Sequence, residues 1–256
     1  MQTPESALES DSRFARRVAA LAGDLLLELR AGGTASGGEE LKAMGDRASQ
    51  ELLAGELAAC RPGDAVLSEE APDDAARLDA GRVWIIDPLD GTREYSEGRH
   101  DWAVHVALWE SGRLTAAAVA LPGLGSVLGT EPAEELPSWN AGAPLRMAVS
   151  RSRPPAFATD LARVLEADLL PMGSAGYKIA SVVRGETDLY VHAGGQYEWD
   201  SAAPVAVAQA AGLHASRVDG SPLAYNSADP SLPDLVVCRR ELSDRVLSSI
   251  RGLGAL

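Results

Sequence analysis

The sequence predicts a layered α/β protein, and three observations support that class. Apolar residues recur at helical spacing in several long segments, whereas other apolar runs are short and bounded by turn residues. The short runs fall into two groups, one before and one after residue 144. Helices that alternate with two groups of strands are typical of sheets stacked between layers of helices.

The first half, residues 1–144, is expected to hold two helices followed by one sheet. Phe14 and Val18 begin an apolar stripe, so an amphipathic helix is predicted over residues 11–30, capped by Asp11 or Ser12. Residues 31–38 are rich in Gly, Thr and Ser, which predicts a mobile loop and a candidate lid. The other predicted elements are a helix over 46–59, a strand over 83–86, and a hairpin of strands over 103–108 and 114–120.

The second half, residues 145–256, is expected to form one compact unit with the first. Ser174 is a good N-cap, which predicts a helix from there to Arg184, closed by Gly185. Pro204 is tolerated in the first turn of a helix over residues 202–211. The remaining predictions are strands at 147–149, 169–170, 188–192 and 236–238, and helices over 156–167 and 241–250.

Composition limits the class of protein. The chain has 256 residues, and 23 Lys plus Arg against 37 Asp plus Glu give a net charge of −14. Such a charge argues against nucleic-acid binding but allows a small phosphorylated substrate, provided that metal ions reverse the local field. Cys60 and Cys238 form no C-x-x-C pair, which favours the reducing cytoplasm. The N-terminus is polar, and no long apolar segment is free of Pro and Gly, so neither a signal peptide nor a membrane span is expected.

The run W-I-I-D-P-L-D-G-T at 84–92 is the most informative segment. Its apolar strand delivers Asp87 to the strand end, Pro88 cannot donate to the ladder, and Asp90 follows on the turn. Two carboxylates about 5 Å apart repel by roughly 3 kcal/mol at an effective dielectric near 20. Mg²⁺ suits these hard oxygens, because it binds through one or two carboxylates plus substrate phosphate. The alternative is that both acids only cap a turn.

Further acidic residues stand beside apolar runs. Glu70 and Asp200 occupy the edges of predicted elements, as Asp87 and Asp90 do. A lone buried carboxylate is costly, so acids on an apolar scaffold are usually paired or bound to metal.

With these residues the chain resembles the inositol monophosphatase superfamily of magnesium-dependent, lithium-sensitive phosphatases. The matching motifs are S-E-E at 68–70, W-I-I-D-P-L-D-G-T at 84–92, G-S-A at 173–175 and W-D-S-A-A at 199–203. Their order and spacing match over nearly the whole chain. The resemblance implies a five-layer αβαβα sandwich with a metal site between its two halves.

The resemblance also implies roles for individual residues. Two to three Mg²⁺ ions are expected on Glu70, Asp87, Asp90, Asp200 and the Leu89 carbonyl. Asp46 and Thr92, with Glu70, are the expected catalytic residues for in-line attack by a metal-activated water, without a protein nucleophile. The substrate is expected to contact Asp90, Gly91, Thr92, Arg151, Gly173, Ser174, Ala175, Lys178 and Asp200, its scissile phosphate on the N–H groups of Gly91 and Thr92.

Other positions bear on the substrate. Ala193 stands where inositol phosphatases carry an acid for the ring hydroxyls, and a small apolar residue cannot accept those hydrogen bonds. The segments T-R-E-Y at 92–95, S-R-S at 150–152 and G-Y-K-I at 176–179 resemble bisphosphate nucleotidases, and H-A-G-G-Q-Y-E-W-D at 192–200 resembles actinobacterial CysQ-type phosphatases. A second phosphate would need fixed positive charge, for which Lys178, Arg151 and Arg153 are candidates, with Tyr177 stacked on adenine.

The resemblance implies magnesium-dependent removal of the 3′-phosphate from 3′-phosphoadenosine 5′-phosphate, in sulfate assimilation, with a homodimer as the candidate assembly. One alternative is a broad phosphatase for fructose 1,6-bisphosphate or inositol phosphate; another is a catalytically silent metal- or nucleotide-binding protein. The sequence holds no G-x-S-x-G or P-loop motif, and its histidines form no H-E-x-x-H. His105, on a strand, is expected to pack in the core, and Glu198 to form a salt bridge.

Overall fold

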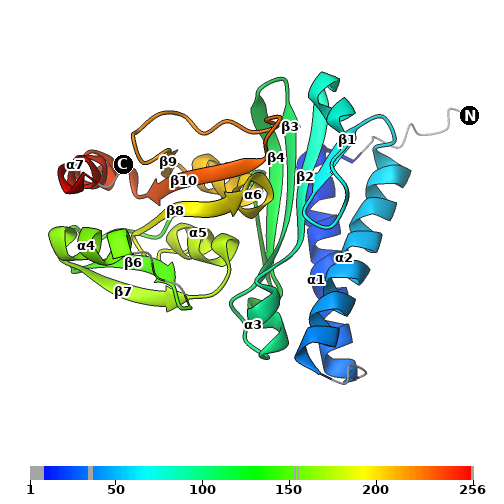
Figure 1. Cartoon of the computed structure of the whole chain (residues 1–256), viewed down its shortest axis with the longest axis horizontal. Helices are drawn as coiled ribbons and strands as arrows, with labels where there is room; N and C mark the ends of the chain where they lie inside the picture. Colours follow the sequence, from blue (N-terminus) through cyan, green and yellow to red (C-terminus); the bar gives the residue numbers. More distant parts are fainter. Residues whose placement is uncertain (1–8, 34–36, 153, 155, 255–256) are drawn as a thin grey trace, which may run out of the picture.

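A computed structural model describes residues 9–33, 37–152, 154 and 156–254. Two five-stranded mixed sheets alternate with three layers of helices (Figure 1). The elements of the first sheet and its helices are α1 (Asp11–Gly32), α2 (Gly38–Cys60), β1 (Ala65–Ser68), β2 (Arg82–Asp90), α3 (Thr92–Ser96), β3 (Ala103–Glu110), β4 (Arg113–Leu121) and β5 (Ser126–Gly129).

The second sheet has the strand order β7-β6-β8-β10-β9, in which β6 runs parallel to both β7 and β8. The first sheet keeps sequence order, and only its β1–β2 pair is parallel. The elements of this half are β6 (Leu145–Ser150), α4 (Ala156–Leu165), β7 (Ala167–Met172), α5 (Ala175–Val183), β8 (Leu189–Tyr197), α6 (Glu198–Ala210), β9 (His214–Ser216), β10 (Ser231–Cys238) and α7 (Ser243–Leu253).

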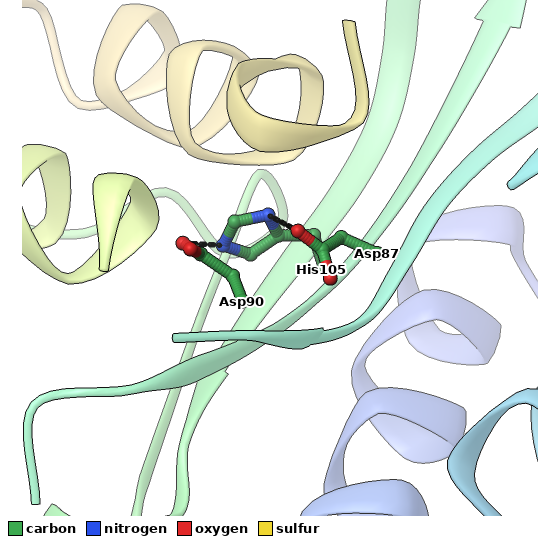
Figure 2. Close-up of side chains that lie close together, drawn as sticks. All are labelled: Asp87, Asp90 and His105. Atoms are coloured by element: carbon green, nitrogen blue, oxygen red, sulfur yellow. Dashed lines mark ion pairs between the residues drawn. The ribbon is translucent and has the colours of Figure 1, made fainter. Parts of the chain in front are cut away.

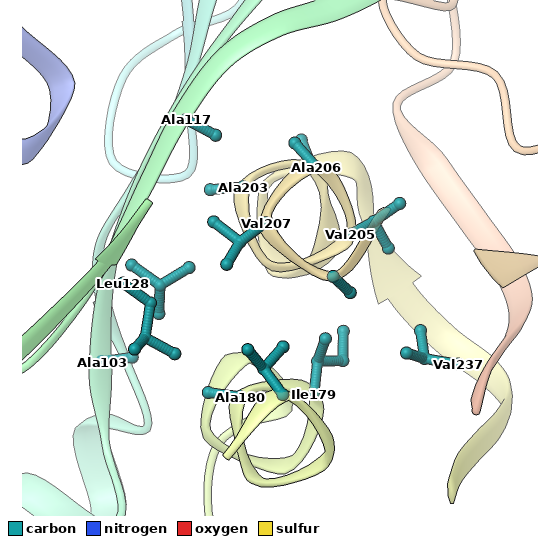
Figure 3. Close-up of a cluster of buried hydrophobic side chains, with 14 of the residues drawn as sticks. Ala103, Ala117, Leu128, Ile179, Ala180, Ala203, Val205, Ala206, Val207 and Val237 are labelled. Carbon is teal, nitrogen blue, oxygen red and sulfur yellow. The ribbon is translucent and has the colours of Figure 1, made fainter. Parts of the chain in front are cut away.

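Three hydrophobic cores bind the layers together. One lies between the first sheet and the helices α1 and α2, and another between the second sheet and the helices α4 and α7. The central core joins both sheets through α5 and α6 (Figure 3). Small residues such as Ala103, Ala117 and Ala203 let α6 pack closely against the first sheet. The predicted five-layer sandwich is confirmed, and none of the described helices is long and apolar enough to cross a membrane.

The start of the second helix was misplaced. The helix α2 begins at Gly38, so Asp46 lies inside it and not at its N-terminus. Gly45, which lies in the part of α2 before Asp46, serves packing, because a Cβ there would lie 3.0 Å from side-chain atoms of Leu89 and Tyr95. The proposed loop and lid at 31–38 is shorter than expected, since helices occupy both of its ends, and residues 34–36 lie outside the described chain.

Other boundaries also differ. Ser10 caps α1, in place of Asp11 or Ser12. The strand β2 continues through Pro88, and β8 continues through Gly194 and Gly195 up to Tyr197. The helix α6 starts at Glu198, so Pro204 lies in its interior and not in its first turn.

Candidate active site

The end of β2 brings two carboxylates to one side of the sheet. Residues three apart on a regular strand point to opposite faces, but the register with β3 shifts between Asp87 and Asp90. The irregular backbone is held by the Leu89 N–H, which donates to Asp87 Oδ1 (3.0 Å), and by the Ser49 hydroxyl, which donates to the Pro88 carbonyl (2.6 Å). Both acids therefore flank the ring of His105 on β3 (Figure 2).

Asp90 connects the first sheet to α5. Its Oδ1 accepts a hydrogen bond from the Ala175 N–H (3.2 Å), and its Oδ2 accepts one from the Gly176 N–H (2.6 Å). Ser174 caps the same helix by accepting from the Tyr177 N–H, as predicted. A carboxylate at a helix N-terminus is favourable, because it pairs with free N–H groups and with the positive end of the helix dipole.

Glu69 and Asp200 complete what we call the acidic cluster, which consists of Glu69, Asp87, Asp90 and Asp200. Glu69 follows β1, and its carboxylate lies beside Asp87. Asp200 lies in the first turn of α6, where its Oδ2 accepts from the Tyr197 N–H (2.7 Å). Residues from β2, the β1 end and α6 thus meet between the two sheets.

The electrostatics of the acidic cluster call for a cation. Burial raises the pKa of Asp87 well above its ordinary value, and the charges of Glu69, Asp90 and Asp200 raise it further. Burial, with the charge of Asp90, also raises the pKa of Asp200 to about 7. Asp87 Oδ2 is buried and has no hydrogen-bond partner among the described residues. Since an unpaired buried charge costs several kcal/mol, this donor set suits a divalent cation.

Sequence reasoning selected Glu70 as the ligand of the S-E-E motif, but the structure places Glu69 in the acidic cluster. Burial and the charges of Asp200, Asp90 and Glu70 raise the pKa of Glu69. Glu70 instead lines a hollow beside Asp46, and its negative charge raises the pKa of Asp46. Both glutamates lie in the turn that follows β1, and this turn directs Glu69 toward the cluster and Glu70 toward Asp46.

Asp46, Glu70 and Thr92 are the expected catalytic residues. Burial, and then the charge of Glu70, raise the pKa of Asp46 to about 7, and the two residues line one hollow of about 460 Å³. Thr92 begins α3 directly after Gly91, whose φ of 93° favours glycine. A Cβ on Gly91 would also lie 2.9 Å from the Ser174 Cβ, so only glycine fits between the two halves here.

A polar cavity of about 500 Å³ opens beside Asp90 and Asp200. Residues of both sheets contribute to its walls, among them the expected substrate residues of α5. Ala193 lies on its β8 side. The lining consists of Asp90, Gly91, Glu94, Ser150, Ser152, Gly173, Ser174, Ala175, Lys178, Tyr190, His192, Ala193, Gly194, Gly195, Gln196 and Asp200.

Lys178 is buried beneath this cavity. Its ammonium donates to the carbonyls of Gly173 and Ser174, the latter at 2.9 Å, and lies 5.4 Å from the centre of the Tyr190 ring. Burial lowers the pKa of Lys178, while nearby acids, Asp90 foremost, oppose this shift. Two of the three ammonium donors therefore hold the loop before α5, in addition to any role toward substrate.

The other proposed substrate groups are engaged elsewhere. The Arg151 guanidinium forms ion pairs with Glu94 and Glu97, so its charge is already neutralised. Arg153 lies outside the described residues. Tyr177 does not reach the cavity, because it is buried in the central core with its ring edge against His100; its stacking on adenine is not supported.

Two further expectations are corrected. Glu198 forms no salt bridge among the described residues; its carboxylate accepts from the backbone N–H groups of Asn226 (2.6 Å) and Ser227 (2.8 Å). His105 is buried as expected, but it faces the acidic cluster, and with Asp87 and Asp90 it forms a group that could hold a metal ion. The alternation of β3 would have indicated this, since the cluster lies on the same face.

Known proteins resemble the chain over most of its length. Residues 8–253 match the model of the inositol monophosphatase family. The chain is 50% identical to the 3′-phosphoadenosine 5′-phosphate phosphatase of Mycobacterium leprae, over 94% of each protein. It is 52% identical to the protein of the same name from Mycobacterium tuberculosis, over 90% of this chain and 89% of that protein.

A solved structure of a family member has the same fold. The structure of CysQ from Bacteroides thetaiotaomicron, a bacterial member of the inositol monophosphatase family, superimposes with a TM-score of 0.78 at 25% identity, covering 90% of this chain and 97% of the other. Shared fold, matched motifs and near-complete coverage lead to one conclusion. The chain belongs to the inositol monophosphatase family.

Proposed function

We propose that the chain is a magnesium-dependent phosphatase that removes the 3′-phosphate of 3′-phosphoadenosine 5′-phosphate to give AMP. The observation that carries this proposal is the acidic cluster, in which four carboxylates from three segments of the chain meet beside a polar cavity. The mycobacterial relatives, which bear the name of this activity, support the choice of substrate.

The donor chemistry of the acidic cluster suits Mg²⁺. We propose that Glu69, Asp87, Asp90 and Asp200, with the Leu89 carbonyl, hold two to three ions, and that Glu70 lies outside this set. When bound, the ions supply an activated water and stabilise the leaving oxygen. Hard oxygen donors are the ligands that Mg²⁺ prefers, and the unpartnered Asp87 Oδ2 offers one of them.

The chain's own residues then orient water and substrate. Asp46 and Thr92 hold the water in line with the scissile phosphate. The negative charge of Glu70 helps to raise the pKa of Asp46. The N–H groups of Gly91 and Thr92 bind the phosphate, at a position where Gly91 has no side chain to obstruct it. Ser174 and its neighbours on α5 form the facing wall.

The cavity is proposed to bind the nucleoside and its second phosphate. Lys178 supplies fixed positive charge, and Arg151 has a smaller part in the proposal, since Glu94 and Glu97 neutralise it. Ala193 lines the cavity without an acceptor for ring hydroxyls, which disfavours inositol phosphate. We place the protein in the cytoplasm, in agreement with its two free cysteines, and expect a homodimer.

Phosphate release tests the proposal. Initial rates are measured with Mg²⁺ on 3′-phosphoadenosine 5′-phosphate, fructose 1,6-bisphosphate and inositol 1-phosphate, and compared as kcat/KM. The bisphosphate nucleotide should be preferred, and EDTA should abolish turnover. A preference for inositol phosphate would contradict the interpretation of Ala193, and no turnover of any ester would favour a catalytically silent binding protein.

A further inference from the structure

His105 occupies the centre of the site without belonging to any expected set of functional residues. It is fully buried on β3, directly opposite Asp87 in the strand pairing. Its imidazole lies between two members of the acidic cluster (Figure 2). The Nδ1 atom is 3.9 Å from Asp87 Oδ2, and the Nε2 atom is 3.3 Å from Asp90 Oδ2.

The ring is also tied to α6. Nδ1 lies 3.0 Å from the backbone carbonyl of Trp199, which can only accept, so Nδ1 carries the hydrogen and donates it. Trp199 directly precedes Asp200, the member of the acidic cluster that α6 contributes. One side chain of the first sheet therefore fixes the first turn of a helix from the second half.

The third contact is with α5. A Cβ on Gly176 would collide with His105 Nε2, so the helix backbone packs directly on the ring. The Gly176 N–H donates to Asp90 Oδ2, the oxygen that faces Nε2. The imidazole, the Asp90 carboxylate and the start of α5 are thus packed directly against one another, and this packing requires glycine at 176.

We propose that His105 is a positioning residue for metal binding, which fixes Asp200 relative to Asp87 and Asp90 through its hydrogen bond to the Trp199 carbonyl. The inference rests on the proposed metal site. Groups behind metal ligands set ligand orientation, and their loss typically lowers metal affinity about 10- to 100-fold. Here the hydrogen bond from His105 on β3 to Trp199 on α6 sets the distance between Asp200 and the two carboxylates of β2.

Two substitutions of similar size and polarity separate this role from packing. In His105→Asn the amide nitrogen takes the place of Nδ1 and can still donate to the Trp199 carbonyl; in His105→Gln it takes the place of Nε2 and cannot. His214→Asn serves as control, because His214 lies on β9 at the edge of the second sheet. Calorimetric titration with Mg²⁺ alone, and the Tm in EDTA with and without added Mg²⁺, are measured for each protein.

The Asn variant and the control should bind Mg²⁺ within about threefold of the wild type, and the Gln variant at least about tenfold more weakly. The Tm values of the two His105 variants in EDTA should agree, and at saturating Mg²⁺ the KM for the nucleotide should not change. Equal Mg²⁺ affinity in the Asn and Gln variants, whether both normal or both weak, would overturn the proposal. A wild-type protein that binds no Mg²⁺ would instead refute the proposed function.

Discussion

The metal-free protein should lose stability as the pH rises, and Asp200 makes this loss measurable. Burial and the charge of Asp90 raise the pKa of Asp200 from 3.8 to about 7. In the unfolded chain the group has its ordinary pKa and is ionised above about pH 5. The native state therefore retains a proton that the unfolded state has released, so the free energy of unfolding falls as the pH rises toward the native pKa.

The size of the decrease in the free energy of unfolding follows from the pKa shift of Asp200. Between about pH 5 and pH 8 the native Asp200 binds an extra proton over about two pH units, which amounts to about 3 kcal/mol. The buried His105 and the half-buried His192 have lowered pKa values and act in the opposite direction, so the wild-type curve alone does not isolate the effect. The variant Asp200→Asn removes the titration and keeps an oxygen for the Tyr197 N–H.

Urea unfolding in EDTA measures the difference between the two proteins. Between about pH 5 and pH 8 the free energy of unfolding of Asp200→Asn, relative to that of the wild type, should rise by about 3 kcal/mol. The rise should be larger still if Glu69 and Asp87 contribute, because Asp200 also raises their pKa values. Saturating Mg²⁺ at the higher pH should stabilise the wild type preferentially. A difference that stays constant within about 0.5 kcal/mol would refute the electrostatic reasoning.

Three further predictions concern turnover and metal binding. Asp90→Asn should lower kcat about 10²- to 10³-fold while far-ultraviolet circular dichroism stays native; near-normal kcat would exclude the proposed site. Glu69→Gln should weaken Mg²⁺ binding in a calorimetric titration about tenfold or more, and Glu70→Gln should weaken it much less; the reverse order would restore Glu70 as the ligand. Lys178→Met should lower kcat/KM for 3′-phosphoadenosine 5′-phosphate more than for inositol 1-phosphate, and equal losses would limit Lys178 to bracing its loop.

Much of the fold could be predicted because its local patterns are strong. The hairpin of β3 and β4 has long apolar strands around Ser111 and Gly112, and α5 has a serine cap and a closing Gly185. The start of α2 could not be predicted, because glycine has low helix propensity and the close packing of Gly45 against β2 and α3 is visible only in the tertiary structure. The division of the chain at residue 144 into two halves stays a prediction.

The sequence predicted which acidic segments form the candidate site, but not which way each side chain points. Motif spacing selected Asp87, Asp90 and Asp200, which the fold brings together. The choice between Glu69 and Glu70 depends on the conformation of the turn after β1, and nothing in the local sequence pattern specifies that conformation. Strand alternation could have indicated the face on which His105 lies, but its hydrogen bond to Trp199, more than ninety residues further along the chain, is shown only by the tertiary structure.

The position of a divalent cation in a crystal grown with Mn²⁺ tests the proposed metal site on the acidic cluster. Anomalous difference maps should show peaks within about 2.3 Å of carboxylate oxygens of Glu69, Asp87, Asp90 and Asp200, and none on Glu70 alone. A map without a peak among these four carboxylates, at Mn²⁺ concentrations that support full turnover, would show that the acidic cluster is not the metal site.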